Sequence, residues 1–178
     1  GAPLWMVFIT NIASALVWFI LNGVVSVYLK VSPFITSLCI MYMCRGILNT
    51  VCAAQKYSIP VYMYEYDSWT VKIAVLIAVY VICWFLFEKS GIGKANKAAG
   101  GNPLAAQQAG IHVNRTRMTA YIISGITVGI AGFILMLRAG SVSTSTGQGL
   151  EMNVITALVL GGVPLSGGSK VKIIGALI

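Results

Sequence analysis

"LWMVFITNIASALVWFILNGVVSVYL", at residues 4–29, contains no charged side chain. A helix of about 20 apolar residues is long enough to cross the hydrocarbon core of a bilayer, so this stretch predicts a transmembrane helix. The rest of the chain has the same character, since 58% of its 178 residues are hydrophobic and only 9% are charged. Soluble domains carry about 25% charged residues. The composition therefore excludes an ordinary soluble domain.

Three further apolar runs each predict another transmembrane helix; they lie at about 33–53, 71–87 and 119–137. Pro33 suits the first turn of the second helix, and Arg45 is the only charged residue within it. The predicted fold is all-α: a polytopic transmembrane helical bundle that forms one domain over residues 1–178. Because the chain has no initiator Met and its last apolar run stops early, we expect this domain to be incomplete at both ends.

Three glycines recur at helical spacing in the fourth apolar run: Gly125, Gly129 and Gly132. Small residues allow membrane helices to approach one another closely. The spacing therefore predicts tight packing of this helix against a neighbour.

The net charge of +8 would suggest nucleic acid as a partner of a soluble chain. Here the basic residues lie mostly between apolar runs, so lipid head groups and membrane topology explain them better, and no nucleic acid is expected. Residues 88–118 hold five basic side chains and one acidic one, whereas the charges in and around the tyrosine-rich residues 54–70 cancel. The positive-inside rule places residues 88–118 in the cytoplasm and residues 54–70 outside.

The reactive side chains do not form a catalytic or metal-binding pattern. The four cysteines form no CxxC pair and the chain has a single histidine, His112, so neither a metal site nor a disulfide is predicted. No Ser–His–Asp set, paired carboxylates or Cys–His arrangement is present in the sequence. We therefore do not expect the chain to be an enzyme.

One short polar helix is clearly marked within "GGNPLAAQQAGIHVNR", residues 100–115. Asn102 is a good N-cap, Pro103 suits the first helical position, and Gly110 fits just past the end. The residues between them are strong helix formers, so a helix of about two turns is predicted. It would either lie against its own membrane domain or be presented to a cytosolic partner, and the residues alone leave both possibilities open.

A broken or re-entrant segment is predicted after the fourth apolar run. "VITALVLGG", at residues 154–162, is too short to cross a bilayer and is interrupted by Gly161 and Gly162. Such backbone is tolerated at membrane depth only where protein or a water-filled path surrounds it. Glu151 or Asn153 would either cap a helix starting near residue 154 or mark a translocation path.

Four blocks of sequence occur in a fixed order: "SPFITSLCIMYMCRGI" (32–47), "GGNPLAAQQAGIHVNR" (100–115), "YIISGITVGIAGFILMLRAGS" (121–141) and "GQGLEMNVITALVLGGVPLSGG" (147–168). Together they resemble the permease subunit of bacterial ABC importers for ribose-like sugars. The resemblance implies inward transport of a monosaccharide or similar small polar solute across the bacterial inner membrane. It also implies a second permease subunit, an external solute-binding protein and cytosolic ATPase subunits, which bind the ATP, so that this chain needs no cofactor.

The resemblance assigns candidate residues to two roles. The AAxxxG pattern of Ala105, Ala106 and Gly110, together with Asn102, is similar to the coupling loop through which importer permeases engage their ATPases. Weaker candidates for the translocation path are Arg45, Glu151, Asn153, Gly161 and Gly162. The chain departs from the usual family pattern at Met152 and Asn153, and at Ser169 and Lys170, which bears on the identity of the solute.

Two alternatives remain open. The same kind of importer could carry branched-chain amino acids, nucleosides or a signalling molecule. An ion-coupled secondary transporter would also use broken helices near the middle of the membrane. Arg45 and Glu151 are the only plausible ionisable residues for ion coupling within the apolar part of the sequence.

Overall fold

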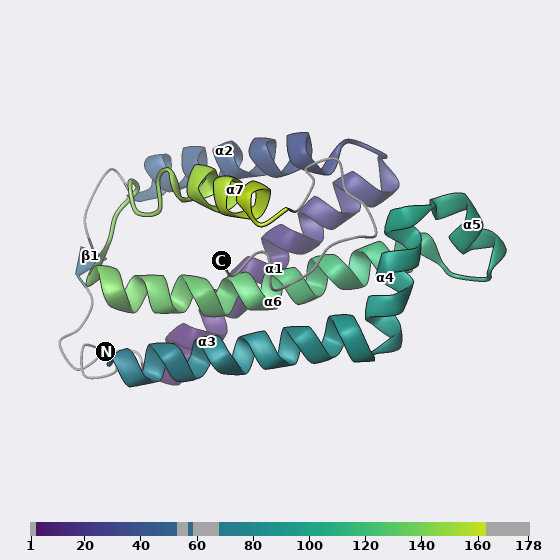
Figure 1. Ribbon diagram of the computed structural model, residues 1–178. Coiled ribbons are helices and arrows are strands. Elements are labelled where there is room, and N and C mark those ends of the chain that lie inside the picture. The colour runs from purple at the N-terminus through teal and green to yellow at the C-terminus, as the bar shows by residue number, and fades with distance from the viewer. Residues whose placement is uncertain (1–2, 53–56, 59–67, 163–178) are drawn as a thin grey trace. The chain divides into compact units, whose positions relative to one another are not determined.

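Four long apolar helices dominate the computed structural model, which describes residues 3–52, 57–58 and 68–162 (Figure 1). They are α1 (Leu4–Tyr28), α2 (Pro33–Cys52), α3 (Trp69–Trp84), which continues into a π-helical turn η2 (Phe85–Lys89), and α6 (Val113–Ala139). Each is long and apolar enough to cross a membrane, α3 together with η2. The predicted all-α, multi-span fold is therefore confirmed.

The chain divides into two compact units, and each is described by itself. The first, which we call the bundle unit, comprises residues 1–79 and 118–146 and holds α1, α2 and most of α3 and α6. The second, the loop unit, comprises residues 80–117 and 147–178. It holds the end of α3, η2, α4 (Gly91–Gly101), α5 (Pro103–Gln108), the start of α6 and α7 (Leu150–Leu160).

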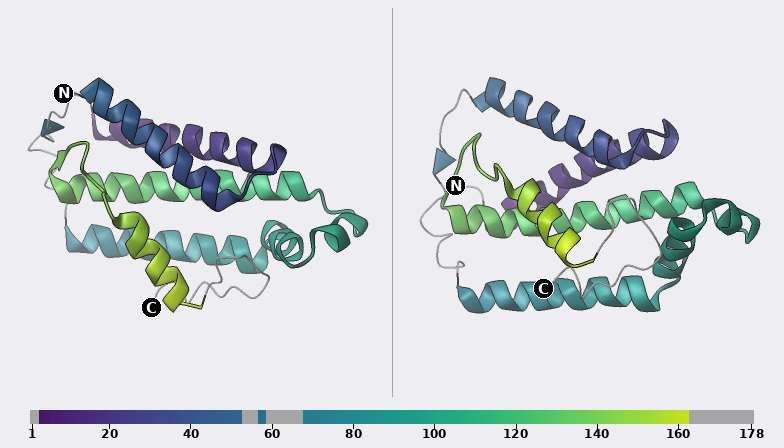
Figure 2. Two further views of the ribbon diagram at one scale, coloured as in Figure 1. Left: turned by 90° about the horizontal axis from the view of Figure 1, so that it is seen from above. Right: turned by 45° about the horizontal axis from the view of Figure 1, so that its top comes forward.

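In the bundle unit, α1 packs closely against α6 at two glycines of α6 (Figure 2). A Cβ placed on Gly129 would lie 2.8 Å from Cα of Ile12, and one on Gly125 would lie 3.0 Å from Cβ of Phe19. Real Cβ atoms do not come within 2.8 Å of another backbone atom, so Gly129 requires glycine, and at Gly125 a Cβ would fit only if Phe19 shifted slightly. Gly132 has more room, with its nearest neighbour at 3.4 Å. The predicted glycine-mediated packing is confirmed at Gly125 and Gly129.

A small apolar core extends the same contact toward the start of α1. Phe133 and Leu137 of α6 are buried. The ring of Phe8 meets that of Phe133 edge to face, with ring centroids 5.1 Å apart, a geometry that aromatic quadrupoles favour. By contrast, about half of the large apolar side chains of α1 and most of those of α3 are exposed, as suits helices that face lipid or further helices.

The connection from α1 to α2 is a tight corner. Lys30 adopts a left-handed conformation with φ +55°, which is uncommon for a residue with a side chain. Ser26, buried near the end of α1, donates a hydrogen bond of 3.4 Å to the carbonyl of Val31. α2 then begins at Pro33, as predicted.

Two short strands were not predicted. β1 (Tyr57–Ser58) pairs antiparallel with β2 (Ser141–Val142), with Tyr57 opposite Val142. Both belong to the bundle unit. Two-residue strands produce no alternating pattern that a sequence could show. Most of the predicted external loop, at 53–56 and 59–67, lies outside the described residues.

The structure corrects the predicted start of the short apolar helix. α7 begins at Leu150, four residues before the predicted start at Val154. Its N-cap is Gly149, with φ +83° and no side-chain cap. Glu151 and Asn153 are therefore not the N-cap, since both lie within the helix, although Glu151 stands in its first turn, where a negative charge is favourable. The rest of the predicted broken segment, from residue 163 onward, lies outside the described residues.

Candidate functional site

The short helix α5 is capped at its N-terminus as predicted. The side-chain oxygen Oδ1 of Asn102 accepts hydrogen bonds from the backbone N–H groups of Leu104 and Ala105, both at 3.1 Å. Pro103 occupies the first helical position, where its missing N–H costs nothing. Local hydrogen bonds therefore close the N-terminal end of the helix.

The C-terminus of α5 is closed just as completely. Gly110 adopts φ +82°, and its N–H donates to the carbonyl of Gln107 at 3.0 Å. The N–H of Ile111 donates to the carbonyl of Ala106 at 2.9 Å. This pair of bonds is a Schellman motif. A helix of six residues is marginal alone in water, and these caps give it a defined shape.

One face of α5 rests on its own chain, which answers one of the questions left open by the sequence. Ala106 is 4% exposed and belongs to a buried cluster with Ala99 of α4 and Val113 at the start of α6, against which Ile111 also packs. Small side chains at these positions let α4 and α5 approach each other closely. Ala106 therefore supports α5 from inside the loop unit.

The other face of α5 is open. Leu104 is 72% exposed, and Ala105, Gln107 and Gln108 are also exposed. The helix carries no charged residue. The sequence analysis did not single out Leu104. It could have done so, because Leu104 is the one large apolar residue in a short helix whose two caps are clear from the sequence.

The candidate coupling residues thus lie together on one small element but in different environments. Asn102 and Gly110 form its two caps, Ala105 is on its exposed side, and Ala106 is internal. The structure brings all four together, and their role in coupling remains a prediction.

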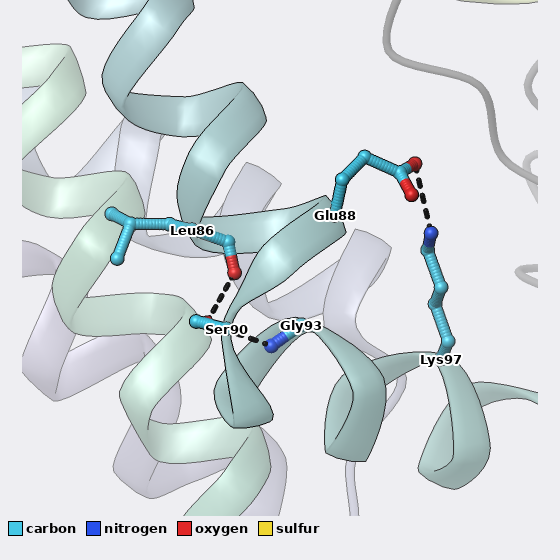
Figure 3. A network of polar contacts seen from close by, with 5 residues as sticks. All are labelled: Leu86, Glu88, Ser90, Gly93 and Lys97. Atoms are coloured by element: carbon cyan, nitrogen blue, oxygen red, sulfur yellow. Dashed lines mark hydrogen bonds and ion pairs between the residues drawn. The ribbon is translucent and has the colours of Figure 1, made fainter.

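A second helix, α4, precedes α5 and was not predicted, because its sequence "GIGKANKAAGG" contains four glycines, which disfavour helices. Figure 3 shows how it begins. The hydroxyl of Ser90 donates to the carbonyl of Leu86 and accepts a hydrogen bond from the N–H of Gly93 at 3.4 Å. Gly93 is buried, and a Cβ placed on it would lie 2.6 Å from Cα of Phe87. The glycine is what allows α4 to turn so tightly against η2.

An ion pair crosses the same corner. Nζ of Lys97 in α4 lies 2.9 Å from Oε1 of Glu88 in η2 (Figure 3). Both side chains are 40% exposed. Pairs in such positions contribute about 0–1 kcal/mol. Its geometric effect is to tie the middle of α4 to the turn before it.

The weaker candidates for a translocation path fall in two places. Arg45 is half-buried in α2, within the bundle unit. Glu151 and Asn153 lie in the first turns of α7, Gly161 is its C-cap, and Gly162 follows with φ +78°. The structure therefore groups four of the five along one helix of the loop unit and leaves Arg45 in the other unit.

Among residues 3–52, 57–58 and 68–162, no group of three His, Cys, Asp or Glu side chains is placed to hold a metal ion. The described cysteines Cys39, Cys44 and Cys83 are free thiols. The features with clear geometry in the loop unit are the caps of α5, the tight corner between η2 and α4, and the exposed face of α5.

Four membrane-length helices with a basic loop between the third and fourth define a multi-pass membrane protein. The chain belongs to the family described as the branched-chain amino acid transport system / permease component, which matches residues 1–178. The resemblance to ABC sugar permeases is confirmed by the relatives of the chain.

Three relatives illustrate the family. The chain is 35% identical to the L-arabinose transport system permease protein AraH of Escherichia coli (strain K12), over 83% of this chain and 47% of the relative. It is 33% identical to the ribose import permease protein RbsC of Bacillus subtilis (strain 168), over 88% and 51%. It is 43% identical to the autoinducer 2 import system permease protein LsrC of Enterobacter sp. (strain 638), over 59% and 30%.

The chain spans about half the length of the first two of these relatives. No solved structure shows significant similarity to it.

Proposed function

We propose that the chain is the membrane-spanning subunit of an ABC importer that moves a monosaccharide or similar small polar solute inward. Its family membership and its similarity to the permeases named for L-arabinose and ribose support this function. Transport would proceed by alternating access, driven by ATP hydrolysis on partner subunits, and the chain itself would not be an enzyme. The partners are a second permease subunit, ABC ATPase subunits and an extracytoplasmic solute-binding protein.

The observation that carries the proposal is the doubly capped helix α5 with its exposed, uncharged face. An ATPase that binds this face moves a rigid element, because both ends of the helix are closed by hydrogen bonds and Ala106 ties it to α4 and α6. Leu104 and Ala105 supply the apolar contact, while Asn102 and Gly110 maintain the shape. Coupling requires an element that both sites bias between two states, and a rigid helix between two membrane spans is suited to this.

The charge distribution supports the required orientation. With residues 88–118 on the cytoplasmic side of the bacterial inner membrane, the five basic side chains of this segment face the anionic inner leaflet. α5 is then on the side where ATP is hydrolysed. Residues 54–70 face outward, toward the solute-binding protein.

For the solute path we propose α7 and Arg45. α7 has 11 residues, about 16 Å at the α-helical rise, and so is about half the thickness of the hydrocarbon core. A half-length helix in a membrane needs protein or water around its ends. Glu151 and Asn153 in its first turns, and the backbone of Gly161 and Gly162 at its end, supply polar groups that a hydroxylated solute can bind.

A second candidate solute is a small signalling molecule. The similarity to the autoinducer 2 import permease, 43% identity over 105 residues, favours this possibility. The two candidate solutes, a monosaccharide and a signalling molecule, are distinguished by an uptake assay. Cells that express the full-length protein with its partners are given labelled ribose, L-arabinose or autoinducer 2, and the uptake of each is measured.

The coupling role is tested by purifying the full-length protein from native membranes in mild detergent and identifying the proteins that accompany it. Two variants with the same substitution are compared: Ala105→Glu on the exposed face of α5, and Ala98→Glu, which is exposed on α4. We expect an ABC ATPase to accompany the parent and Ala98→Glu, and to be lost from Ala105→Glu while that variant remains folded. A parent that carries no ATPase in any mild detergent contradicts the importer and favours ion-coupled transport.

A further inference from the structure

α5 is joined to two membrane-length helices by different routes. Toward the C-terminus it leads directly into α6 through residues 109–112. Toward the N-terminus it leads through α4 and η2 into α3. The second route is longer, and would transmit movement only if each of its junctions were rigid.

The junction between η2 and α4 is held rigidly by hydrogen bonds and by close backbone packing. Ser90 bonds at once to the turn before it and to the helix after it, through Leu86 and Gly93. A Cβ on Gly93 would collide with the backbone of Phe87, so the two segments are in direct main-chain contact. A flexible side chain can relieve a close contact by changing its rotamer, whereas backbone in contact with backbone cannot.

The junction between α4 and α5 is also closed. Ala99, at 2% exposed, and Ala106, at 4%, belong to the same buried cluster. Between the two junctions, the ion pair of Glu88 and Lys97 ties the middle of α4 back to η2. The π-helical form of η2 also favours a functional role for this junction, because π-helical turns occur frequently at functional sites.

We propose that α4 is a strut that passes the movement of α5 to α3, in parallel with the direct route to α6, and that Gly93 and Lys97 are positioning residues for this transmission. The inference rests on the proposed function, in which an ATPase binds α5. It adds that binding of the ATPase to α5 moves both α3 and α6. It also adds that a substitution at the junction between η2 and α4 can remove the movement of α3 without removing that of α6.

The test uses the full-length protein in complex with its ATPase, in lipid nanodiscs, on a background without the native cysteines. A single bimane label is attached at Ile77→Cys on α3 or at Val128→Cys on α6, both exposed positions. The change in bimane fluorescence on addition of ATP and vanadate reports the movement of each helix. In the parent we expect a change at both positions.

In Gly93→Ala we expect the response at residue 77 to be lost and that at residue 128 to be retained. General misfolding would abolish both, so a selective loss is not explained by a structural defect. The matched control is Gly91→Ala, because a Cβ at Gly91 meets nothing within 4 Å; it should keep both responses. In a Gly93→Ala protein that is folded and still binds the ATPase, loss of both responses or retention of both would overturn the strut.

A milder variant keeps the proposal testable if Gly93→Ala does not fold. Lys97→Glu should reduce the response at residue 77, and the charge exchange with Glu88→Lys should restore it; absence of rescue contradicts the role of this pair. If no ATPase accompanies the parent, the proposed function itself fails. If the ATPase is bound and only residue 128 responds in the parent, coupling stands and the strut is wrong.

Discussion

The N–H of Ile111 donates a 2.9 Å hydrogen bond to the carbonyl of Ala106, across the end of α5. Ala106 also belongs to the buried cluster with Ala99 of α4 and Val113 of α6, and Ile111 packs against that cluster. The residues that end the helix therefore also attach it to α4 and α6. The bond depends on the left-handed conformation of Gly110 between them.

Gly110→Ala is expected to loosen the end of α5. A residue with a Cβ pays about 1–2 kcal/mol in the left-handed region, although nothing stands within 4 Å of that Cβ to clash with it. Hydrogen–deuterium exchange of the full-length protein should show faster exchange at residues 110 and 111. Gly91→Ala is the control: Gly91 is the first residue of α4, is equally unobstructed and is not left-handed, so exchange at residues 110 and 111 should stay as in the parent.

Leu104→Ala is expected to weaken binding of the ATPase without destabilising the permease. Leu104 is 72% exposed, so its removal leaves no cavity in the fold. Full burial of a leucine against a partner contributes about 1.5–3 kcal/mol, which corresponds to a loss of affinity of roughly tenfold or more. Surface plasmon resonance with the purified ATPase measures it. Ile92→Ala on α4 is the control, and an equal loss in that variant would argue against a specific role for α5.

Gly129→Ala is expected to separate α1 from α6. Its Cβ would lie 2.8 Å from Cα of Ile12, so the helices must move apart, at a cost of about 1–3 kcal/mol. Thermal unfolding of the detergent-solubilised full-length protein, followed by tryptophan fluorescence, should show a lower midpoint. Gly46→Ala in α2, where nothing stands within 4 Å, should leave the midpoint unchanged or raise it; a fall of the same size there would contradict the packing argument.

Lys30→Gly is expected to stabilise the corner between α1 and α2. Lys30 has φ +55°, and relief of this conformation is worth about 1 kcal/mol. The midpoint of thermal unfolding should therefore rise. The same change at Lys94, inside α4, should lower it, because glycine costs about 1 kcal/mol in a helix. No rise for Lys30→Gly would mean that its side chain makes a compensating contribution.

The sequence alone predicted the features that depend on residues close to one another along the chain. The four spans follow from runs of apolar residues, and the caps of α5 follow from the order Asn102, Pro103 and Gly110, whose hydrogen bonds reach no more than a few residues. Pro33 marked the start of α2 for the same reason. The recurrence of Gly125 and Gly129 also predicted close helix packing, although it did not identify α1 as the partner.

The tertiary structure decided what depends on residues that meet only after folding. α4 forms despite its four glycines, and one of them, Gly93, is needed because a Cβ there would collide with the backbone of Phe87. Ala106 turns inward because Ala99 and Val113 meet it there, which leaves Leu104 outside. β1 pairs with β2 across more than eighty residues of chain. Local hydrogen bonds and hydropathy are properties of a short stretch of sequence. Which face of a short helix is buried and which is exposed depends instead on the surfaces that pack against it.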